Sequence, residues 1–210
     1  MSSTPLNNGQ GLEVQEMTVI ETFFSGCEIG NAEQVSAAIT LGVDVNRVNM
    51  FGVTGLTIAA QNNNCAVLKR LLENSTLEVN KRKVDGENYK SGATALHEAC
   101  VKDNAKAVEM LCEDIRVITD GINMQTLGFG DTPLHCAVRN GSMSCIQALS
   151  KVDNIDWNVK NLAGNTPILV ALKLKNLEIS MMLAKIEGIS LLCADRQGKT
   201  FEKIARLGAI

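Results

Sequence analysis

The two histidines are the residues of this chain whose type and position best suit catalysis or metal binding. His97 and His135 each stand three residues after a threonine, in Thr-Ala-Leu-His and Thr-Pro-Leu-His. A general base would need a nucleophile nearby, and a metal site would need a second ligand; neither segment supplies one. A structural histidine needs only hydrogen bonds to the threonine and to the adjacent loop backbone. We therefore predict a structural role for both histidines, with no catalytic residue and no metal.

The cysteines and glycines indicate no zinc, redox or phosphate site. Seven cysteines are scattered along the chain without Cys-x-x-Cys spacing, so we expect most of them to be small buried side chains in a reducing compartment. Gly198-Lys199-Thr200 is similar only to the end of a phosphate-binding loop, whose full Gly-x-x-x-x-Gly-Lys-Ser/Thr pattern is missing from the chain. No cofactor is predicted.

Composition and charge narrow the class of protein. Hydrophobic residues make up 45% of the chain and aromatic residues only 3%, so small and aliphatic side chains must supply the packing. A net charge of −3 gives no general attraction to nucleic-acid backbones. The chain has neither a signal-peptide pattern nor a run of about 18 apolar residues. We expect no membrane span and a cytoplasmic protein, with the nucleus as a second location.

Five copies of Gly-x-Thr indicate how these residues are positioned. The threonines are Thr54, Thr94, Thr132, Thr166 and Thr200, and successive ones are 40, 38, 34 and 34 residues apart. A near-constant period of this size is typical of a stacked array, in which each unit buries its apolar face only against its neighbours. The sequence therefore predicts an elongated repeat protein rather than a globular catalytic domain.

The unit that starts at Gly130 predicts a pair of helices and a loop. Thr132 suits an N-cap, Pro133 the first helical position, and Gly141 the end of the first helix. A second helix is predicted over 142–150, with an inner face of Cys145, Ile146 and Leu149. The segment 153–164 is rich in Asn, Asp and Gly, which favour turns. A projecting loop should therefore carry the chain to the next helix pair.

Three segments of the chain resemble the ankyrin repeat signature. They are Gly-Ala-Thr-Ala-Leu-His-Glu-Ala (92–99), Gly-Asp-Thr-Pro-Leu-His-Cys-Ala (130–137) and Gly-Asn-Thr-Pro-Ile-Leu-Val-Ala (164–171). The resemblance covers roughly residues 18–208. It implies an all-α repeat solenoid of stacked helix-turn-helix units, with β-hairpin-like fingers projecting from one edge. It also implies that the fingers and the first helices bind a protein partner.

The repeat register divides the chain into units. We expect a flexible N-terminal segment over 1–17 and an ankyrin repeat domain over 18–210. Its units are predicted at 18–48 (N-terminal cap), 49–83, 84–124, 125–159, 160–193 and 194–210 (partial unit or C-terminal cap). The longest spacing places its extra residues in 81–91, which predicts a lengthened, charged finger. The last unit stops one helix short, either as a cap or as the edge of a longer chain.

Two features of the predicted fingers allow more than one interpretation. The basic run 81–83 could be a nuclear-import signal, a phosphate-binding knob or a partner contact, but Asp85 and Glu87 half-neutralise it, which favours a solvated tip. Trp157 stands where other units have Val or Ile, which favours partial inward packing. An exposed Trp157 or Tyr89 would instead be a natural interface anchor.

Repeats occupy almost the whole chain and leave no segment large enough for an active site. We therefore predict a non-catalytic scaffold or adaptor that binds another protein as a monomer. Two alternatives stay open: a regulator similar to the inhibitor-of-NF-κB group, which masks a transcription factor, and the targeting module of a larger enzyme or channel. The register predicts these partner-binding residues: Arg47, Met50, Lys81, Lys83, Tyr89, Glu98, Lys102, Asp131, Arg139, Trp157, Lys160 and Lys173.

Overall fold

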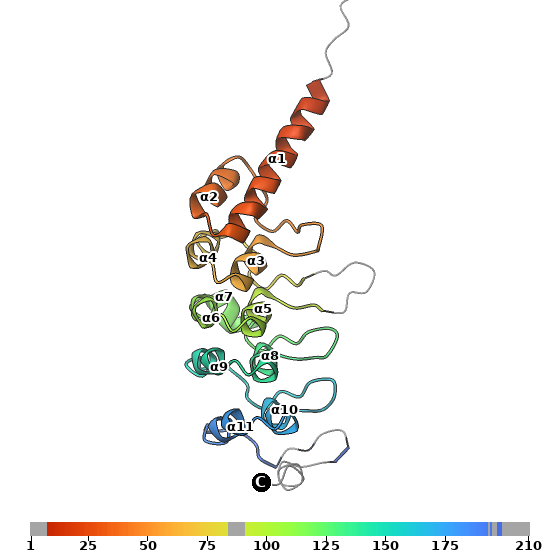
Figure 1. Cartoon of the computed structure of the whole chain (residues 1–210), viewed down its shortest axis with the longest axis vertical. Helices are drawn as coiled ribbons and strands as arrows, with labels where there is room; N and C mark the ends of the chain where they lie inside the picture. Colours follow the sequence, from red (N-terminus) through yellow and green to blue (C-terminus); the bar gives the residue numbers. More distant parts are fainter. Residues whose placement is uncertain (1–7, 84–90, 193, 195–196, 199–210) are drawn as a thin grey trace, which may run out of the picture.

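The helices form two parallel rows along an elongated stack (Figure 1). The computed structural model describes residues 8–83, 91–192, 194 and 197–198. The first row holds α1 (Asn8–Ile29), α3 (Gly55–Gln61), α5 (Ala95–Val101), α8 (Pro133–Asn140) and α10 (Pro167–Lys173). The second row holds α2 (Ala32–Thr40), α4 (Cys65–Leu72), α6 (Ala105–Cys112), α9 (Met143–Leu149) and α11 (Leu177–Leu183). Each first-row helix packs on the next. The predicted all-α repeat solenoid is confirmed.

The motif threonines start the first-row helices because their side chains satisfy backbone N–H groups of the first turn. Thr132 Oγ1 accepts the N–H of His135 at 3.3 Å. Pro133 follows at a position whose N–H would have no helical partner. Gly141 then ends α8 in the left-handed conformation, at φ 74°. All three assignments were predicted from the sequence and are confirmed.

The apolar core runs between the two rows. Equivalent first-row positions hold Leu56, Leu96, Leu134 and Ile168, and equivalent second-row positions hold Leu71, Leu111, Leu149 and Leu183; all are buried. Small side chains let the layers approach closely. A Cβ built on Gly55 would lie 2.7 Å from the ring of Phe23, so the glycine that replaces the usual proline in this unit makes room for α1.

Helix α1 begins earlier than the sequence indicated. Residues 1–17 were expected to form a flexible segment, but α1 already includes residues 8–17; residues 1–7 lie outside the described part. The first unit lacks the Thr-Pro-Leu-His box, so no start signal marked the helix. Phe23 and Cys27 of α1 are fully buried. Once this packed part is helical, each further residue adds to the helix at little cost.

Helix α7 (Ile115–Asp120) is an element that the sequence prediction missed. It follows α6 and packs against it. The available signal was the spacing of 38 residues from Thr94 to Thr132, four more than in the next unit. Asp114 caps α7 and pairs with Arg116 at 2.6 Å, and this hydrogen-bonded guanidinium lowers the pKa of the Asp114 carboxyl.

Four fingers, counted up to α10, connect the described helix pairs along one edge of the stack (Figure 1). We number them finger 1 (residues 43–54), finger 2 (77–94), finger 3 (121–132) and finger 4 (155–166). One backbone hydrogen bond closes each at an equivalent place, from the N–H of residues 49, 83, 126 and 161 to the carbonyl of residues 53, 93, 131 and 165. Among the described residues, the fingers form no strand, only a bridge between Val48 and Thr54.

Finger 2 is the longest. Its closing bond joins Lys83 to Ala93, ten residues apart, whereas that of finger 4 joins residues four apart. The six additional residues equal the excess of the 40-residue spacing over the 34-residue one. The tip, residues 84–90, lies outside the described residues, as does nearly all of the predicted unit 194–210. Among the helices that are described, none has the length and apolar character needed to span a bilayer.

Candidate binding surface

Each of the two histidines joins the start of its helix to the following finger. His97 Nδ1 lies 2.9 Å from Thr94 Oγ1, and its Nε2 lies 2.9 Å from the carbonyl oxygen of Met124 in finger 3. His135 repeats this with Thr132 at 2.8 Å and the Asn165 carbonyl at 2.9 Å. Because a carbonyl only accepts, Nε2 carries the proton. Nδ1 accepts a backbone N–H, from Thr94 in His97 and from Thr132 in His135, each at 3.2 Å, so both rings are neutral. The predicted structural role is confirmed.

Burial keeps both imidazoles neutral. It lowers the pKa of His97 to about 4 and outweighs the hydrogen bonds from Nε2 to the Asp131 and Met124 carbonyls, which favour the charged form. Burial also lowers the pKa of His135. The same cause raises the pKa of the Cys27, Cys112 and Cys136 thiols to about 12, so these cysteines are poor nucleophiles.

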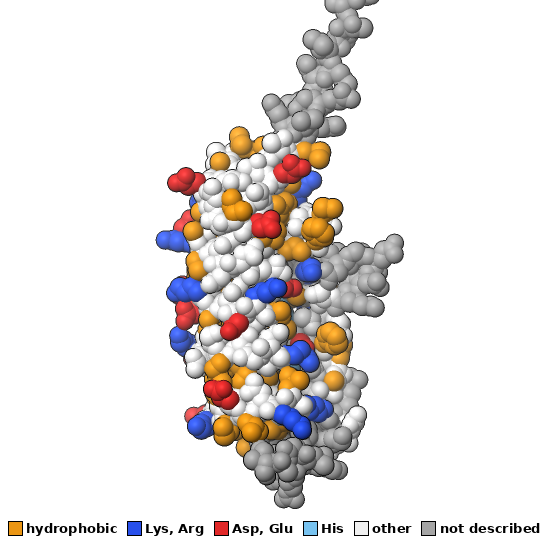
Figure 2. Space-filling model, in the orientation of Figure 1, with side chains coloured by type: hydrophobic (Ala, Val, Ile, Leu, Met, Phe, Trp, Pro, Cys, Tyr) orange, Lys and Arg blue, Asp and Glu red, His pale blue; other side chains and the backbone are white. Residues whose placement is uncertain are grey.

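In the part of the chain that the structure describes, no three His, Cys, Asp or Glu side chains gather where they could hold a metal ion. The two edges of the stack differ in character. Charged side chains of both signs lie along the second-row edge, whereas the described part of the finger edge carries apolar side chains together with Lys and Arg (Figure 2).

Long polar side chains at one repeat position tie each finger to the next. Arg82 Nη1 donates to the Gly92 carbonyl of its own finger at 2.8 Å and to the Gln125 carbonyl of finger 3 at 2.7 Å. Gln125 Nε2 donates in the same way to Gly130 at 2.7 Å and to Lys160 at 2.9 Å. Lys160 Nζ donates onward to the carbonyl of Ala194 at 3.1 Å. We call Arg82, Gln125 and Lys160 the finger ladder.

A second set of bonds explains the recurrence of asparagine after Val45, Ile122 and Trp157. Asn46, Asn123 and Asn158 each donate to a backbone carbonyl of the following unit and accept one of its N–H groups. The donor and acceptor groups of these side chains are therefore used within the protein. Together with the finger ladder, they hold the bases of the fingers in a fixed arrangement.

A groove of about 460 Å³ lies between α5, α8 and finger 3. We call it the α5–α8 groove. Its apolar lining includes Val101 and Phe129, and its polar lining includes Glu98 and Arg139. The Phe129 side chain is 74% exposed. The Arg139 guanidinium carbon lies 6.0 Å from the centre of the Phe129 ring, at the outer limit of a cation–π contact.

Asp131 was predicted to contact a partner, but the structure places it below the surface, where it is 3% exposed. Its Oδ2 accepts from Arg139 Nη2 at 2.8 Å and from Nε at 3.1 Å, and its Oδ1 accepts from Asn161 Nδ2 at 2.7 Å. A buried carboxylate requires such donors. Asp131 therefore positions Arg139 and joins finger 3 to finger 4.

The other predicted contact residues fall in different places. Glu98 and Arg139 line the α5–α8 groove, and Lys102 is exposed just after α5. Arg47 and Met50 line a separate groove beside α1. Lys81 and Lys83 are half-buried in finger 2, and Tyr89 lies outside the described residues. Trp157 is half-buried and packs against the core, as expected from its Val and Ile equivalents. Lys173 Nζ donates to Asn165 Oδ1 at 2.7 Å.

The side chains of the basic run 81–83 have different partners. The Arg82 guanidinium is committed to the finger ladder. Lys81 Nζ pairs with Glu78 at 3.3 Å on the surface. The three cations therefore do not form one patch of free charge.

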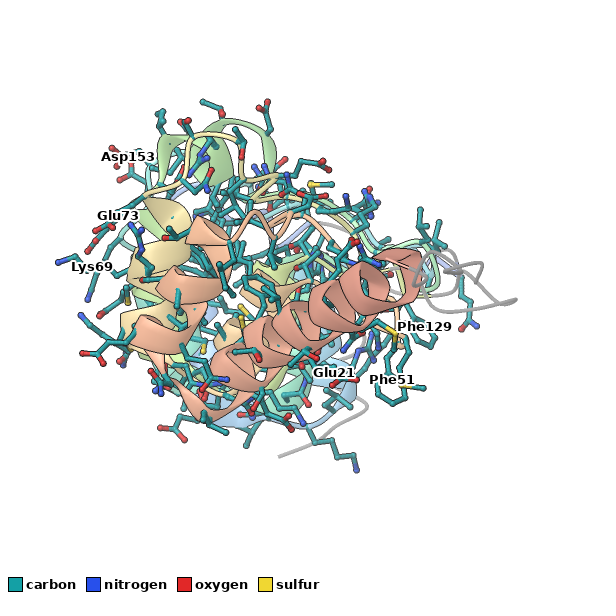
Figure 3. All side chains as sticks on the ribbon, turned by 90° about the horizontal axis from the view of Figure 1, so that it is seen from above. Glu21, Phe51, Lys69, Glu73, Phe129 and Asp153 are labelled. Atoms are coloured by element: carbon teal, nitrogen blue, oxygen red, sulfur yellow. The ribbon has the colours of Figure 1, made fainter. Side chains whose placement is uncertain are left out.

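Sequence reasoning missed Phe51 and Phe129. Each stands immediately before the glycine of a Gly-x-Thr motif, at a finger turn, and they are 67% and 74% exposed. The equivalent residues of fingers 2 and 4 are Ser91 and Ala163. The signal was an aromatic residue at a turn position that fingers 2 and 4 fill with a small one. Figure 3 shows Phe51 and Phe129 on the same side of the stack, opposite Lys69, Glu73 and Asp153.

Comparison with known proteins agrees with this architecture. A model of ankyrin repeats (three copies) matches residues 24–120 and 115–195. The chain is 28% identical over 162 residues to human transient receptor potential cation channel subfamily A member 1, covering 74% of this chain and 14% of that protein. It is 34% identical over 149 residues to the putative ankyrin repeat protein FPV031 of fowlpox virus, covering 68% and 40%.

The mouse B-cell lymphoma 3 protein homolog is 33% identical over 129 residues, which cover 60% of this chain and 27% of that protein. The chain thus spans less than half the length of each of these relatives. Repeats of this kind generally form non-catalytic modules that bind other proteins. The matched family model covers most of the sequence, and the chain belongs to the ankyrin repeat family.

Proposed function

We propose that this chain is a non-catalytic protein-binding module that holds its partner along the finger edge and in the α5–α8 groove. The exposed Phe129 at the mouth of that groove carries the proposal. A large exposed aromatic side chain beside a concave apolar surface is typical of an interface anchor. Phe51, on the same side of the stack, extends the apolar edge (Figure 3).

The rim of the groove carries charges of both signs. Glu98 accepts a hydrogen bond from Gln61 Nε2 at 2.9 Å, and Arg139 is held by the buried Asp131. Fixed charges of opposite sign select partners by complementarity and give little general attraction. Exposed Lys102 lies next to Val101 and adds a second cation near this rim.

The fingers also meet the requirement of a preformed site. The finger ladder and the asparagine bonds fix the finger bases before any partner arrives. Less conformational entropy is then lost on binding. A partner would meet a surface whose shape is set by the stack.

Affinity capture with the intact chain and two matched double variants tests the proposal. Phe129→Ser with Lys102→Glu alters the groove and its rim, and Ile115→Ser in α7 with Lys151→Glu after α9 makes the same types of change away from the groove, where both side chains are exposed. We expect the groove variant to lose partners that the unmodified chain and the control variant retain, with all three giving the same circular dichroism. Equal capture by all three would refute the proposed surface.

A second candidate is that the chain is the targeting module of a larger enzyme or channel. It is favoured by the match to a cation channel subfamily member of which this chain spans 14%. A transcript that continues in frame past Ile210 into a catalytic or membrane domain would support this candidate. A stop codon after Ile210 would exclude it.

The narrower hypothesis of a regulator that masks a transcription factor stays a proposal as well. It is motivated by the similar use of ankyrin units with uneven finger lengths. Co-precipitation with a Rel-type protein tests it, and loss of that binding in the Phe129→Ser, Lys102→Glu variant would place the contact in the α5–α8 groove.

A further inference from the structure

A second groove, of about 570 Å³, lies at the N-terminal end of the stack between α1 and finger 1. We call it the α1 groove. Its walls are largely apolar, formed by Met17, Ile20, Phe24, Met50, Phe51 and Ile58. Met17 is 62% exposed, and Met50 is 90% exposed. Apolar surface of this kind, concave and open to solvent, is suited to receive the apolar face of a partner segment.

The rim of the α1 groove is acidic. Glu21 and Glu28 line it from α1, and both are exposed. Arg47 is the one cation among the described residues that line it, and its Nη1 lies 4.0 Å from Glu16 Oε1. Figure 3 shows Glu21 and Phe51 on the same side of α1. The acidic charge of the rim therefore exceeds the basic charge.

The acidic rim belongs to a charge asymmetry of the whole chain. Residues 1–68 contain six acidic side chains and one basic side chain, Arg47, whereas residues 69–210 contain 17 acidic and 19 basic ones. The α5–α8 groove, by contrast, has both signs on its rim. An excess of one sign around an apolar groove attracts a ligand of the opposite sign and repels one of the same sign.

We propose that the α1 groove binds a cationic amphipathic segment of a partner protein, with apolar side chains in the groove and Lys or Arg beside Glu21 and Glu28. Met17 and Met50 suit such a ligand because flexible thioether side chains adapt to differently shaped apolar surfaces. The α1 groove shares no lining residue with the α5–α8 groove. Each site can therefore fail without the other.

A designed peptide of about 14 residues provides the probe, with Leu at positions i, i+3, i+4 and i+7 and Lys elsewhere. A second peptide replaces each Lys by Glu, and a third scrambles the Leu and Lys order. Each carries a fluorophore, and binding to the intact chain is followed by fluorescence anisotropy. The scrambled peptide keeps the charge but loses the apolar face, so it separates groove binding from general charge attraction.

Two double variants of the protein match each other in charge. Glu21→Lys with Glu28→Lys reverses the rim, and Glu33→Lys with Glu73→Lys reverses two exposed carboxylates of the second row, at α2 and at the end of α4. All four side chains are on the surface, so neither variant should disturb folding. Met50→Ser, in finger 1 and outside every helix, tests the apolar wall separately.

We expect the Leu/Lys peptide to bind the unmodified chain, with a dissociation constant at least tenfold lower than those of the other two peptides. The rim variant should weaken this binding about tenfold or more, Met50→Ser severalfold, and the second-row variant less than about twofold. Raising the salt from about 0.05 M to about 0.3 M should weaken binding as well. Phe129→Ser with Lys102→Glu should leave it unchanged.

Equal binding of the scrambled peptide, equal effects of the two charge-matched variants, or no binding of the Leu/Lys peptide would each overturn the proposal. So would a concentration-dependent dimer of the unmodified chain that the rim variant abolishes, because a second copy would then occupy the groove. Loss of partner capture through the α5–α8 groove alone would leave this result unaffected.

Discussion

Lowering the pH from 7 to 5 should destabilise the folded chain through its two buried histidines. In the folded state the pKa of His97 is about 4, against 6.5 for the free imidazole. Between pH 6.5 and pH 4, His97 is therefore protonated in the unfolded chain but mostly neutral in the folded chain. Stability is therefore lost as the pH falls from 6.5 toward 4. For His97 alone, the shift corresponds to a loss of about 2 kcal/mol by pH 5 and about 3 kcal/mol by pH 4.

Urea unfolding of the unmodified chain and of His97→Gln, followed by circular dichroism at pH 7 and pH 5, measures this loss. The variant should be less stable at pH 7, because the bridge from Thr94 to the Met124 carbonyl is altered. Its further loss on going to pH 5 should be smaller by about 2 kcal/mol. Carboxylates contribute equally to both proteins, and the chain has no histidine besides His97 and His135.

The direct check is the NMR titration of the imidazole Cε1 protons in the folded protein. A His97 titration between pH 6 and pH 7, or an equal loss of stability in both proteins, would refute the reasoning. Adding His135→Gln should flatten the dependence further, since burial lowers the pKa of His135 in the same direction.

Three further substitutions test the packing and the fingers by urea unfolding. Leu134→Ala removes a buried side chain and should lower the free energy of unfolding by about 2–5 kcal/mol. Lys102→Ala, at an exposed position, should change it by less than about 0.5 kcal/mol. The reverse order would mean that the repeat register is misplaced. Arg82→Met removes two hydrogen bonds of the finger ladder and should lower the free energy of unfolding by about 1–3 kcal/mol. Lys81→Met removes only a surface ion pair and should lower it by less than about 1 kcal/mol. Equal effects of the two substitutions would contradict the finger ladder. Gly130→Ala should lower the free energy of unfolding by at least about 1 kcal/mol. The reason is that φ at this position is +66° and the added Cβ would lie 2.8 Å from the backbone nitrogen of Leu162 in finger 4. An unchanged urea midpoint would argue against that close approach.

The binding surface was harder to predict than the fold. Asp131 and Arg82 looked like exposed charged residues of a finger, but each has a hydrogen-bond partner in a later finger. Arg82 donates to a carbonyl 43 residues later, and Asp131 accepts from a side chain 30 residues later. No local pattern shows such a partner, because only the stacking of units brings the two residues together.

The exposed aromatic residues show the opposite difficulty. Phe51 and Phe129 could each have been taken for core residues in a chain so poor in aromatic side chains. The finger turns carry both outward on the same side of the stack (Figure 3). Helix α7 was missed because its six residues are too short to give a clear periodic pattern.

The sequence by itself determined the repeat, the helix starts at threonine, the helix end at Gly141 and the buried leucines. These features follow from interactions within a few residues, namely caps, turns and the 3.6-residue period, which adjacent letters express directly. Only the tertiary structure decided which polar side chains are free to meet a partner. Burial and hydrogen bonding at the fingers depend on the neighbouring unit, 30 or more residues away, so the α5–α8 groove and the acidic α1 groove exist only once the units are stacked.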